Sequence, residues 1–269
     1  MITSNNNAKV KQVVQWQTKA KERRKDHVFL AEGIRMCEEA PVKNVREVYL
    51  TEELEQKIRQ NAQSGDTAFW DKLQQTGYET VSTEVFAKMA DTQTPQGILT
   101  VLEQPVYDLT QLLEQPDPLF LMLENLQDPG NLGTMIRTGE GAGITGVIMN
   151  NQTVDIFNPK TIRATMGSIF RVPFVYVPDL APVLEQMHAK GIHTYAAHLK
   201  GQEYYDSFSF REPTAFLIGN EGNGLSKEIS DQAGQYLKIP MEGRVESLNA
   251  SIAAALLMYE AHRQRSARL

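Results

Sequence analysis

The fold of this chain is decided by one stretch near its C-terminal end, Ile239-Pro-Met-Glu-Gly-Arg-Val-Glu-Ser-Leu-Asn-Ala-Ser-Ile-Ala-Ala-Ala-Leu-Leu-Met-Tyr-Glu260. A short apolar strand ends at Pro240, and a polar loop follows it. Ser247 or Asn249 can cap the next helix, because both side chains accept hydrogen bonds from free backbone N–H groups. That helix is apolar on nearly every side, which predicts that it is buried. A buried helix that carries a polar loop at its N-terminus is a good place for a ligand.

Length and composition predict one large or two modest globular domains. The chain has 269 residues, of which 41% are hydrophobic, enough for a buried core. The single cysteine, Cys37, excludes a disulfide scaffold and a thiolate zinc cluster, and the five histidines lack the spacing of metal ligands. The first residues are polar, and no apolar run reaches the roughly 20 residues that span a bilayer. We therefore expect a soluble cytoplasmic protein without a metal.

The charge pattern leaves two interpretations open. A net charge of −6 argues mildly against nucleic-acid binding. Basic residues nevertheless gather at both ends of the chain: Lys9, Lys11, Lys19, Lys21, Arg23, Arg24, Lys25, Arg263, Arg265 and Arg268. A local basic patch can bind phosphate even on an acidic protein. The alternative is a solvated helix face, which a charge run taken alone favours.

Strand and helix patterns alternate along the chain, which indicates an α/β protein. We predict strands at 27–30, 45–50, 78–81, 97–102, 119–123, 145–149, 173–177, 192–197, 214–218 and 236–239. We predict helices at 8–25, 34–39, 52–61, 69–75, 83–90, 131–142, 159–165, 180–190, 225–231 and 248–262. Residues 104–118 hold three prolines and form a predicted linker with a short helix at 109–114. The second half should form a mostly parallel sheet with helices on both faces.

Two stretches upstream place glycine and asparagine where predicted strands end. The first, Glu124-Asn-Leu-Gln-Asp-Pro-Gly-Asn-Leu-Gly-Thr-Met-Ile-Arg137, leads into a helix whose N-terminus suits an anion. The second is Phe216-Leu-Ile-Gly-Asn-Glu-Gly-Asn-Gly-Leu-Ser226, whose glycines let the backbone approach a flat ligand. A plain turn would not explain Glu221 there. With the C-terminal stretch, both resemble, in order, the three signatures of the SpoU/TrmH branch of the SPOUT RNA methyltransferases, over roughly residues 119–262.

The resemblance implies a fold and a domain organisation. It implies a mostly parallel α/β SPOUT domain at 119–269 in which the chain forms a trefoil knot. Residues 1–103 are similar to the smaller L30e-like α/β domain that binds substrate in such enzymes, on the patterns Lys21-Glu-Arg-Arg-Lys-Asp-His-Val-Phe-Leu-Ala-Glu-Gly33 and Thr94-Pro-Gln-Gly97. Residues 104–118 would link the two. The family also implies a homodimer with the pocket near the subunit interface.

The resemblance implies methyl transfer from S-adenosylmethionine to a ribose 2′-hydroxyl in RNA. The catalytic residues it implies are Asn131, Arg137, Glu221, Ser247 and Asn249. The cofactor residues it implies are Ala197, His198, Leu199, Gly219, Asn220, Glu221, Gly224, Ile239, Met241, Ser247 and Leu248. The family assigns the general base to the arginine, but a pKa above 12 makes that demanding. We therefore assign Arg137 to orientation and charge stabilisation, with a structural ion pair for Arg137 and a simple N-cap for Ser247 as alternatives.

The RNA target follows less directly. Contacts to RNA are expected from Lys21, Arg23, Arg24, Glu32, Lys160 and Arg163, although surface solvation or a dimer contact is the alternative for several of them. The extra N-terminal domain favours ribosomal RNA, above all 23S, over transfer RNA. A non-catalytic RNA-binding homologue is disfavoured by the complete catalytic set. An NAD-dependent dehydrogenase is disfavoured because the run Gly139-Glu-Gly-Ala-Gly143 follows a helix instead of opening one.

Overall fold

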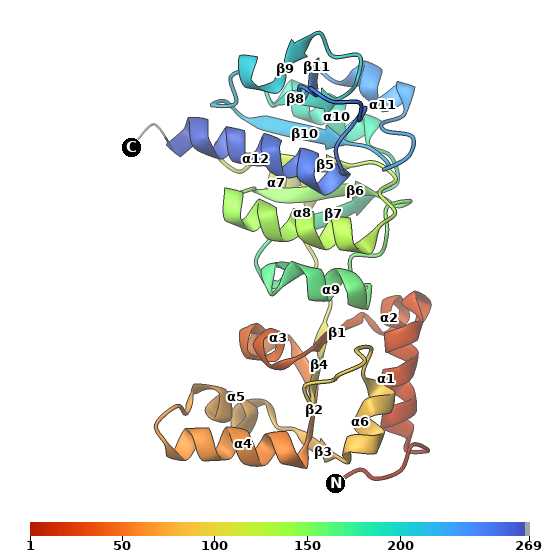
Figure 1. Ribbon diagram of the computed structural model, residues 1–269, viewed down its shortest axis with the longest axis vertical. Helices are drawn as coiled ribbons and strands as arrows, with labels where there is room; N and C mark the ends of the chain where they lie inside the picture. The colour runs from red at the N-terminus through yellow and green to blue at the C-terminus, as the bar shows by residue number, and fades with distance from the viewer. Residues whose placement is uncertain (267–269) are drawn as a thin grey trace. The chain divides into compact units, whose positions relative to one another are not determined.

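The chain forms two compact units in the computed structural model, which describes residues 1–266 (Figure 1). The first unit comprises Met1–Pro105 together with the later segment Phe157–Phe170. The second comprises Val106–Ile156 and the chain from Arg171 onward. The predicted α/β class is confirmed, and each unit has its own sheet.

The first unit is built on a four-stranded sheet with helices on both faces. The strand order is β1-β4-β2-β3, with β4 antiparallel to both neighbours and β3 parallel to β2. The strands are β1 (Val28–Glu32), β2 (Val45–Thr51), β3 (Glu79–Val81) and β4 (Ile98–Glu103). The helices are α1 (Ala8–Thr18), α2 (Ala20–Asp26), α3 (Ile34–Glu39), α4 (Glu52–Gln63), α5 (Ala68–Thr76) and α6 (Thr83–Met89), with a 3-10 turn at Val42–Asn44.

Alternating side chains of these strands supply two separate cores. Leu99 and Tyr49 pack with α1 and α6, whereas Ile98 and Leu50 pack with α3, α4 and α5. This is the period of two that puts successive side chains on opposite faces of a strand. One boundary prediction was wrong: the helix expected at 8–25 is broken at Lys19, whose backbone is extended at φ −124° and ψ 109°.

The segment Phe157–Phe170 packs with the first unit although it lies far along the sequence. It contains α9 (Pro159–Thr165) and a 3-10 turn at Ser168–Phe170. The rings of Phe157 and Phe170 lie 4.9 and 6.2 Å from the ring of Phe29 on β1. Ile162 is buried in the same place. Apolar contact between residues about 130 positions apart therefore completes this unit.

The second unit is built on a seven-stranded parallel sheet. Its order is β7-β6-β5-β10-β8-β11-β9. The strands are β5 (Leu119–Leu123), β6 (Gly146–Asn150), β7 (Phe174–Val177), β8 (His193–Ala197), β9 (Glu203–Tyr204), β10 (Thr214–Ile218) and β11 (Gln235–Lys238). The helices are α7 (Leu109–Leu113), α8 (Pro129–Ala142), α10 (Ala181–Ala189), α11 (Lys227–Gln232) and α12 (Ala250–Ser266), with a 3-10 turn at Tyr205–Ser207.

The strand order brings the ends of distant strands together. The chain runs outward from β5 through β6 to β7 and then returns to the other side of β5 with β8, β10 and β11. The point where the strand order reverses is where open parallel sheets bind ligands, at the carboxyl ends of the strands. The first two signature loops leave β5 and β10, which are hydrogen-bonded neighbours. The topology thus predicts that the two loops meet.

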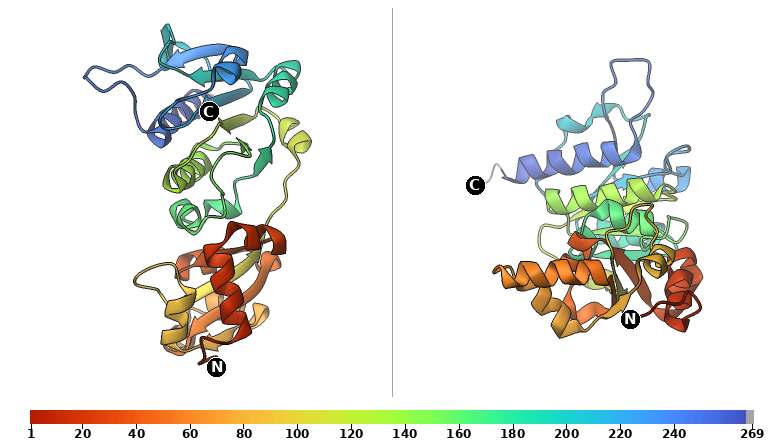
Figure 2. Two further views of the ribbon diagram at one scale, coloured as in Figure 1. Left: turned by 90° about the vertical axis from the view of Figure 1, so that its right-hand side faces the viewer. Right: turned by 60° about the horizontal axis from the view of Figure 1, so that its bottom comes forward.

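Helices α8 and α12 lie side by side over this sheet (Figures 1 and 2). A side chain at Gly139 would collide with Ile144 at 2.3 Å, and one at Gly141 would meet the Tyr259 hydroxyl at 2.9 Å. These glycines lie inside α8, and Gly143 ends the helix with φ +76°. The glycine run therefore serves helix packing and helix termination, which agrees with its exclusion as a dinucleotide loop.

The prediction that α12 is buried on nearly every side was wrong. Ala254, Leu257, Met258 and Ala261 are buried, but Ile252, Leu256 and Tyr259 are 49%, 37% and 49% exposed. Only one face of the helix packs on the second unit. Hydrophobic composition could not reveal this, because both faces of the helix are apolar.

Candidate active site

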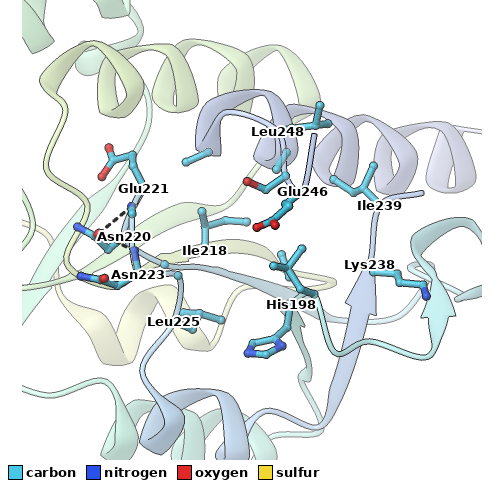
Figure 3. Close-up of a pocket in the computed structure, with 18 of the residues that line it drawn as sticks. His198, Ile218, Asn220, Glu221, Asn223, Leu225, Lys238, Ile239, Glu246 and Leu248 are labelled. Atoms are coloured by element: carbon cyan, nitrogen blue, oxygen red, sulfur yellow. Dashed lines mark hydrogen bonds between the residues drawn. The ribbon is translucent and has the colours of Figure 1, made fainter. Parts of the chain in front are cut away.

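A cavity of about 270 Å³ opens where β8, β10 and β11 end and α12 begins (Figure 3). All eleven residues that the resemblance implied for the cofactor line it: Ala197, His198, Leu199, Gly219, Asn220, Glu221, Gly224, Ile239, Met241, Ser247 and Leu248. The remaining lining residues are Ile218, Gly222, Asn223, Leu225, Leu237, Lys238, Glu246, Ala250 and Ala253. The second and third signatures and the end of β8 therefore form the walls of one pocket.

The turn after β10 needs its glycines for close backbone contact. Asn220 and Gly224 exchange backbone hydrogen bonds of 3.0 and 2.8 Å. A side chain at Gly219 would lie 2.1 Å from the Gly224 carbonyl carbon, and Gly224 itself has φ +68°. The Asn220 side chain accepts from the N–H groups of Gly222 and Asn223 at 2.9 and 3.1 Å. The turn is thus closed on itself and presents Glu221 in one fixed direction.

Glu221 joins the second signature to the first. Its carboxylate accepts hydrogen bonds from the backbone N–H groups of Gln127 (3.1 Å) and Asp128 (3.0 Å) and from the Asn131 side chain (3.0 Å). Partial burial acts to raise the pKa of Glu221, but these hydrogen bonds outweigh it and hold the pKa below its usual value. The carboxylate is therefore charged at neutral pH and acts as an anchor between two loops.

Asn249 connects the third signature to Asn131, and through it to Glu221. Its side-chain nitrogen donates to Asn131 Oδ1 at 3.0 Å. Its oxygen accepts from the backbone N–H and the hydroxyl of Ser251 at 2.9 and 2.6 Å, so Asn249 is the N-cap of α12. The alternative that Ser247 only caps the helix was therefore wrong, and Ser247 lines the pocket instead.

Arg137 is the last of the catalytic candidates. It lies on α8, about two turns after the start of the helix. Its side chain is exposed, and no residue among 1–266 forms an ion pair or hydrogen bond with it. The alternative of a structural ion pair thus has no support in the described part of the chain. An unpaired guanidinium is able to bind an incoming phosphate or hydroxyl.

A further group of polar residues supports the first signature loop, and sequence reasoning missed one of its members. Asn125, at φ +56°, is held by Asn150, whose side chain accepts from its backbone N–H at 3.0 Å and donates to its side chain at 2.9 Å. Asn220 also donates to the Asn125 carbonyl at 2.9 Å. The buried Glu124 accepts from the Ser226 N–H at 2.7 Å. The available signal for Asn150 was its position at the end of a parallel strand.

The structure separates the residues predicted to contact RNA. Lys21, Arg24 and Lys160 are exposed. Arg23 is only 3% exposed and donates to the carbonyls of Trp16 (2.7 Å) and Gln17 (3.3 Å), so its assignment to RNA was wrong. Its guanidinium instead satisfies carbonyls at the end of α1.

Two more of these residues already have partners within the first unit. The Glu32 carboxylate accepts from the Asp91 N–H at 2.8 Å and from the Thr92 hydroxyl, and so holds the turn between α6 and β4. Arg163 forms an ion pair with Asp91. The side chain of Arg163 is 35% exposed.

Comparison with known protein families shows the family to which the chain belongs. The model of the SpoU rRNA methylase family matches residues 118–259. The chain belongs to the SpoU rRNA methylase family. The model of an MRM3-like substrate-binding domain matches residues 7–100 of this SpoU protein, which confirms the predicted substrate-binding domain.

Individual relatives agree with this membership. The chain is 34% identical over 261 residues to the 23S rRNA (guanosine(2553)-2′-O)-methyltransferase RlmP of Bacillus subtilis, covering 96% of this chain and 97% of the relative. The crystal structure of an AdoMet-bound rRNA methyltransferase from Sinorhizobium meliloti has a TM-score of 0.84 and 30% identity, over 97% of each chain. That of the SpoU methyltransferase AviRb from Streptomyces viridochromogenes with AdoMet has a TM-score of 0.83 and 27% identity, over 97% of this chain and 99% of that one.

These findings confirm the predicted enzyme class and cofactor. The SpoU protein is an RNA ribose 2′-O-methyltransferase that depends on S-adenosylmethionine. Among residues 1–266, no cluster of three or more His, Cys, Asp or Glu side chains is arranged to hold a metal ion.

Proposed function

We propose that this SpoU protein methylates a ribose 2′-hydroxyl of 23S ribosomal RNA. The observation that carries the proposal is the hydrogen-bonded chain Glu221–Asn131–Asn249, which joins all three signature loops at the edge of the pocket. The target class is supported by RlmP, which is named as a 23S rRNA enzyme and aligns with 96% of this chain. The match of residues 7–100 to a substrate-binding domain also supports a large folded RNA as the substrate.

The residues of the pocket fit S-adenosylmethionine. Ile218, Leu225 and Leu248 offer apolar surface for a flat base, and the backbone that leaves β11 at Ile239 and Met241 offers amide groups for its polar edge. When bound, S-adenosylmethionine supplies a methyl group that is already activated on a sulfonium.

The protein's own contribution is to position the RNA hydroxyl. Asn131 has both ends of its amide engaged, by Glu221 and by Asn249, so that it is fixed before substrate arrives. Arg137, on the same helix, is free to bind the neighbouring phosphate and to orient the sugar. Glu221 is a poor general base, because three hydrogen bonds hold its charged form and lower its pKa. We assign it to positioning.

RNA recognition falls to exposed basic residues of the first unit. Lys21 and Arg24 on α2 are exposed, and Lys160 and Arg163 lie on α9. Side chains of this kind bind the phosphate backbone and set register without reading the bases. We further propose that the polypeptide has a catalytic domain at 119–269 with the trefoil knot of the family, a linker at 104–118 and a substrate-binding domain at 1–103.

The exposed face of α12 supports a homodimer. Ile252, Leu256 and Tyr259 form an apolar stripe at the surface, with Ala255 and Tyr205 beside it. Exposed apolar stripes on a helix are typical of protein interfaces, and a second copy of the chain is the occupant that the family implies. No helix within residues 1–266 has the length and hydrophobicity needed to cross a membrane. We propose that the homodimer acts in the cytoplasm, where ribosomal RNA is modified.

The proposal is tested with RNA from a strain that lacks the gene. Purified protein and labelled S-adenosylmethionine are incubated separately with 23S ribosomal RNA, 16S ribosomal RNA and transfer RNA from that strain, and the methylated nucleotide is mapped. We expect label in 23S ribosomal RNA as a 2′-O-methylribose, and none with the variant Arg137→Ala. Label in transfer RNA, or on a base, would contradict the proposal.

A further inference from the structure

One charged residue of the pocket has no role in the function described so far. Glu246 lies in the loop between β11 and α12, one position before Ser247, and lines the cavity. Figure 3 shows its carboxylate pointing into the pocket, between Leu248 on one side and His198 on the other. Among residues 1–266, no hydrogen-bond donor or cation pairs with this carboxylate.

The other charges that line the pocket are engaged elsewhere. Glu221 is turned away from Glu246 in Figure 3 and is held by three donors of the first signature loop. The Lys238 ammonium lies over the ring of Tyr204, 5.2 Å from its centroid. His198 accepts a hydrogen bond from the Lys200 N–H through Nδ1 at 3.0 Å. Glu246 is therefore the carboxylate whose charge is directed at the ligand.

The methyl donor and its product differ in charge. Transfer of the methyl group leaves the electrons of the broken S–C bond on sulfur, while the hydroxyl proton passes to solvent. The positive sulfonium becomes a neutral thioether, whereas the adenosine and amino-acid parts stay the same. A carboxylate that faces the ligand attracts the sulfonium but not the neutral thioether. The difference in binding free energy is moderate, because water screens charges in an open pocket.

We propose that Glu246 makes the pocket select the sulfonium donor over S-adenosylhomocysteine, so that product leaves once its charge is gone. This inference rests on the proposed use of S-adenosylmethionine in this pocket. Glu246 acts here as a specificity residue toward the ligand's charge.

The test compares four ligands by calorimetry on the full-length protein and on two variants. S-adenosylmethionine and sinefungin carry the extra positive charge at or beside the sulfur position, whereas S-adenosylhomocysteine and methylthioadenosine lack it. Glu246→Gln removes the charge with little change of shape. Glu242→Gln is the matched control, because Glu242 is an exposed carboxylate of the same loop that does not line the pocket.

We expect Glu246→Gln to weaken binding of the two charged ligands roughly 5-fold and that of the two neutral ones less than about 2-fold. Glu242→Gln should change neither. Equal losses for all four ligands, or no loss for any of them, would overturn the inference. Failure of the unmodified protein to bind any of the four ligands would instead contradict the proposed function of the pocket.

Discussion

Asn131 and Asn249 lie 118 residues apart in the sequence, yet their side-chain amides share a hydrogen bond of 3.0 Å. Asn131 lies in the first turn of α8, and Asn249 is the residue that caps α12. The two helices pack along their length, which brings both N-termini to the same edge of the sheet. Helix packing therefore decides the geometry of the proposed catalytic group.

Asn249 has two functions that substitution can separate. Asn249→Ser keeps a capping oxygen for α12 but is too short to reach Asn131, so methyl transfer should fall at least about 10-fold while the melting temperature stays nearly constant. Asn249→Ala loses both functions and should also cost about 1 kcal/mol of stability. Thermal melts and transfer rates on the two variants measure this. Equal activity in Asn249→Ser and the unmodified protein would show that the contact with Asn131 is dispensable.

Arg137 should be needed for transfer but not for stability or cofactor binding. Its side chain is exposed and has no partner among residues 1–266, so Arg137→Ala should unfold at the same temperature as the unmodified protein. Loss of a group that stabilises charge at the reaction centre should lower the transfer rate by about 100-fold or more. Calorimetry with S-adenosylmethionine is the control, and an active Arg137→Ala would remove the assignment.

The lowered pKa of Glu221 should make the stability of the protein depend on pH. Partial burial raises its pKa, but hydrogen bonds from Asn131, Asp128 and Gln127 prevail and lower it in the folded state. Because the pKa is lowered in the folded state, the charged carboxylate stabilises the protein at pH values above 4.5, the pKa in the unfolded chain. This stabilisation is lost as the pH falls through the pKa of the folded state. Because the residue is exposed, the contribution should be small.

The comparison with Glu221→Gln makes this measurable. The amide cannot accept from all three donors in the same way, so the variant should melt below the unmodified protein at pH 7. The difference should shrink as the pH falls below about 4.5 and the carboxyl group of the unmodified protein becomes protonated. A difference in melting temperature that does not change with pH would contradict the role of Glu221 as a charged anchor.

Arg23 and Arg24 are neighbours with opposite predicted roles. Arg23→Met leaves the carbonyls of Trp16 and Gln17 without their donor, which should cost about 1–3 kcal/mol of stability. Arg24→Met removes an exposed charge, so RNA binding should weaken. The slope of the logarithm of the binding constant against the logarithm of the salt concentration should decrease by about the value of one phosphate contact. Chemical denaturation and binding titrations at several salt concentrations test the pair. The reverse pattern would contradict both roles.

The apolar stripe of α12 should hold two copies together. Leu256→Asp places a charge in the stripe and should convert the dimer to a monomer in light scattering after gel filtration. Val106→Asp is the matched control, because Val106 is 93% exposed and lies outside the stripe. A monomeric unmodified protein, or a Leu256→Asp variant that stays dimeric, would contradict this interface.

The sequence alone determined the helices and strands and most of the residues that line the pocket. Apolar runs, glycines and prolines act over a few residues, so nearly every strand and helix lies within a few residues of its predicted place. The signatures also named the eleven cofactor candidates, which all line one pocket. These residues follow directly after the ends of parallel strands, where local pattern and ligand position coincide.

Only the tertiary structure decided which polar groups are used for support and which are free. Ser247 and Asn249 were equal candidates for a cap, and Arg23 and Arg24 were equal candidates for RNA, until long-range contacts separated them. The same holds for the segment Phe157–Phe170, which packs on Phe29, and for the face of α12 that stays exposed. Burial and hydrogen bonding depend on residues more than a hundred positions away, and local periodicity carries no information about them.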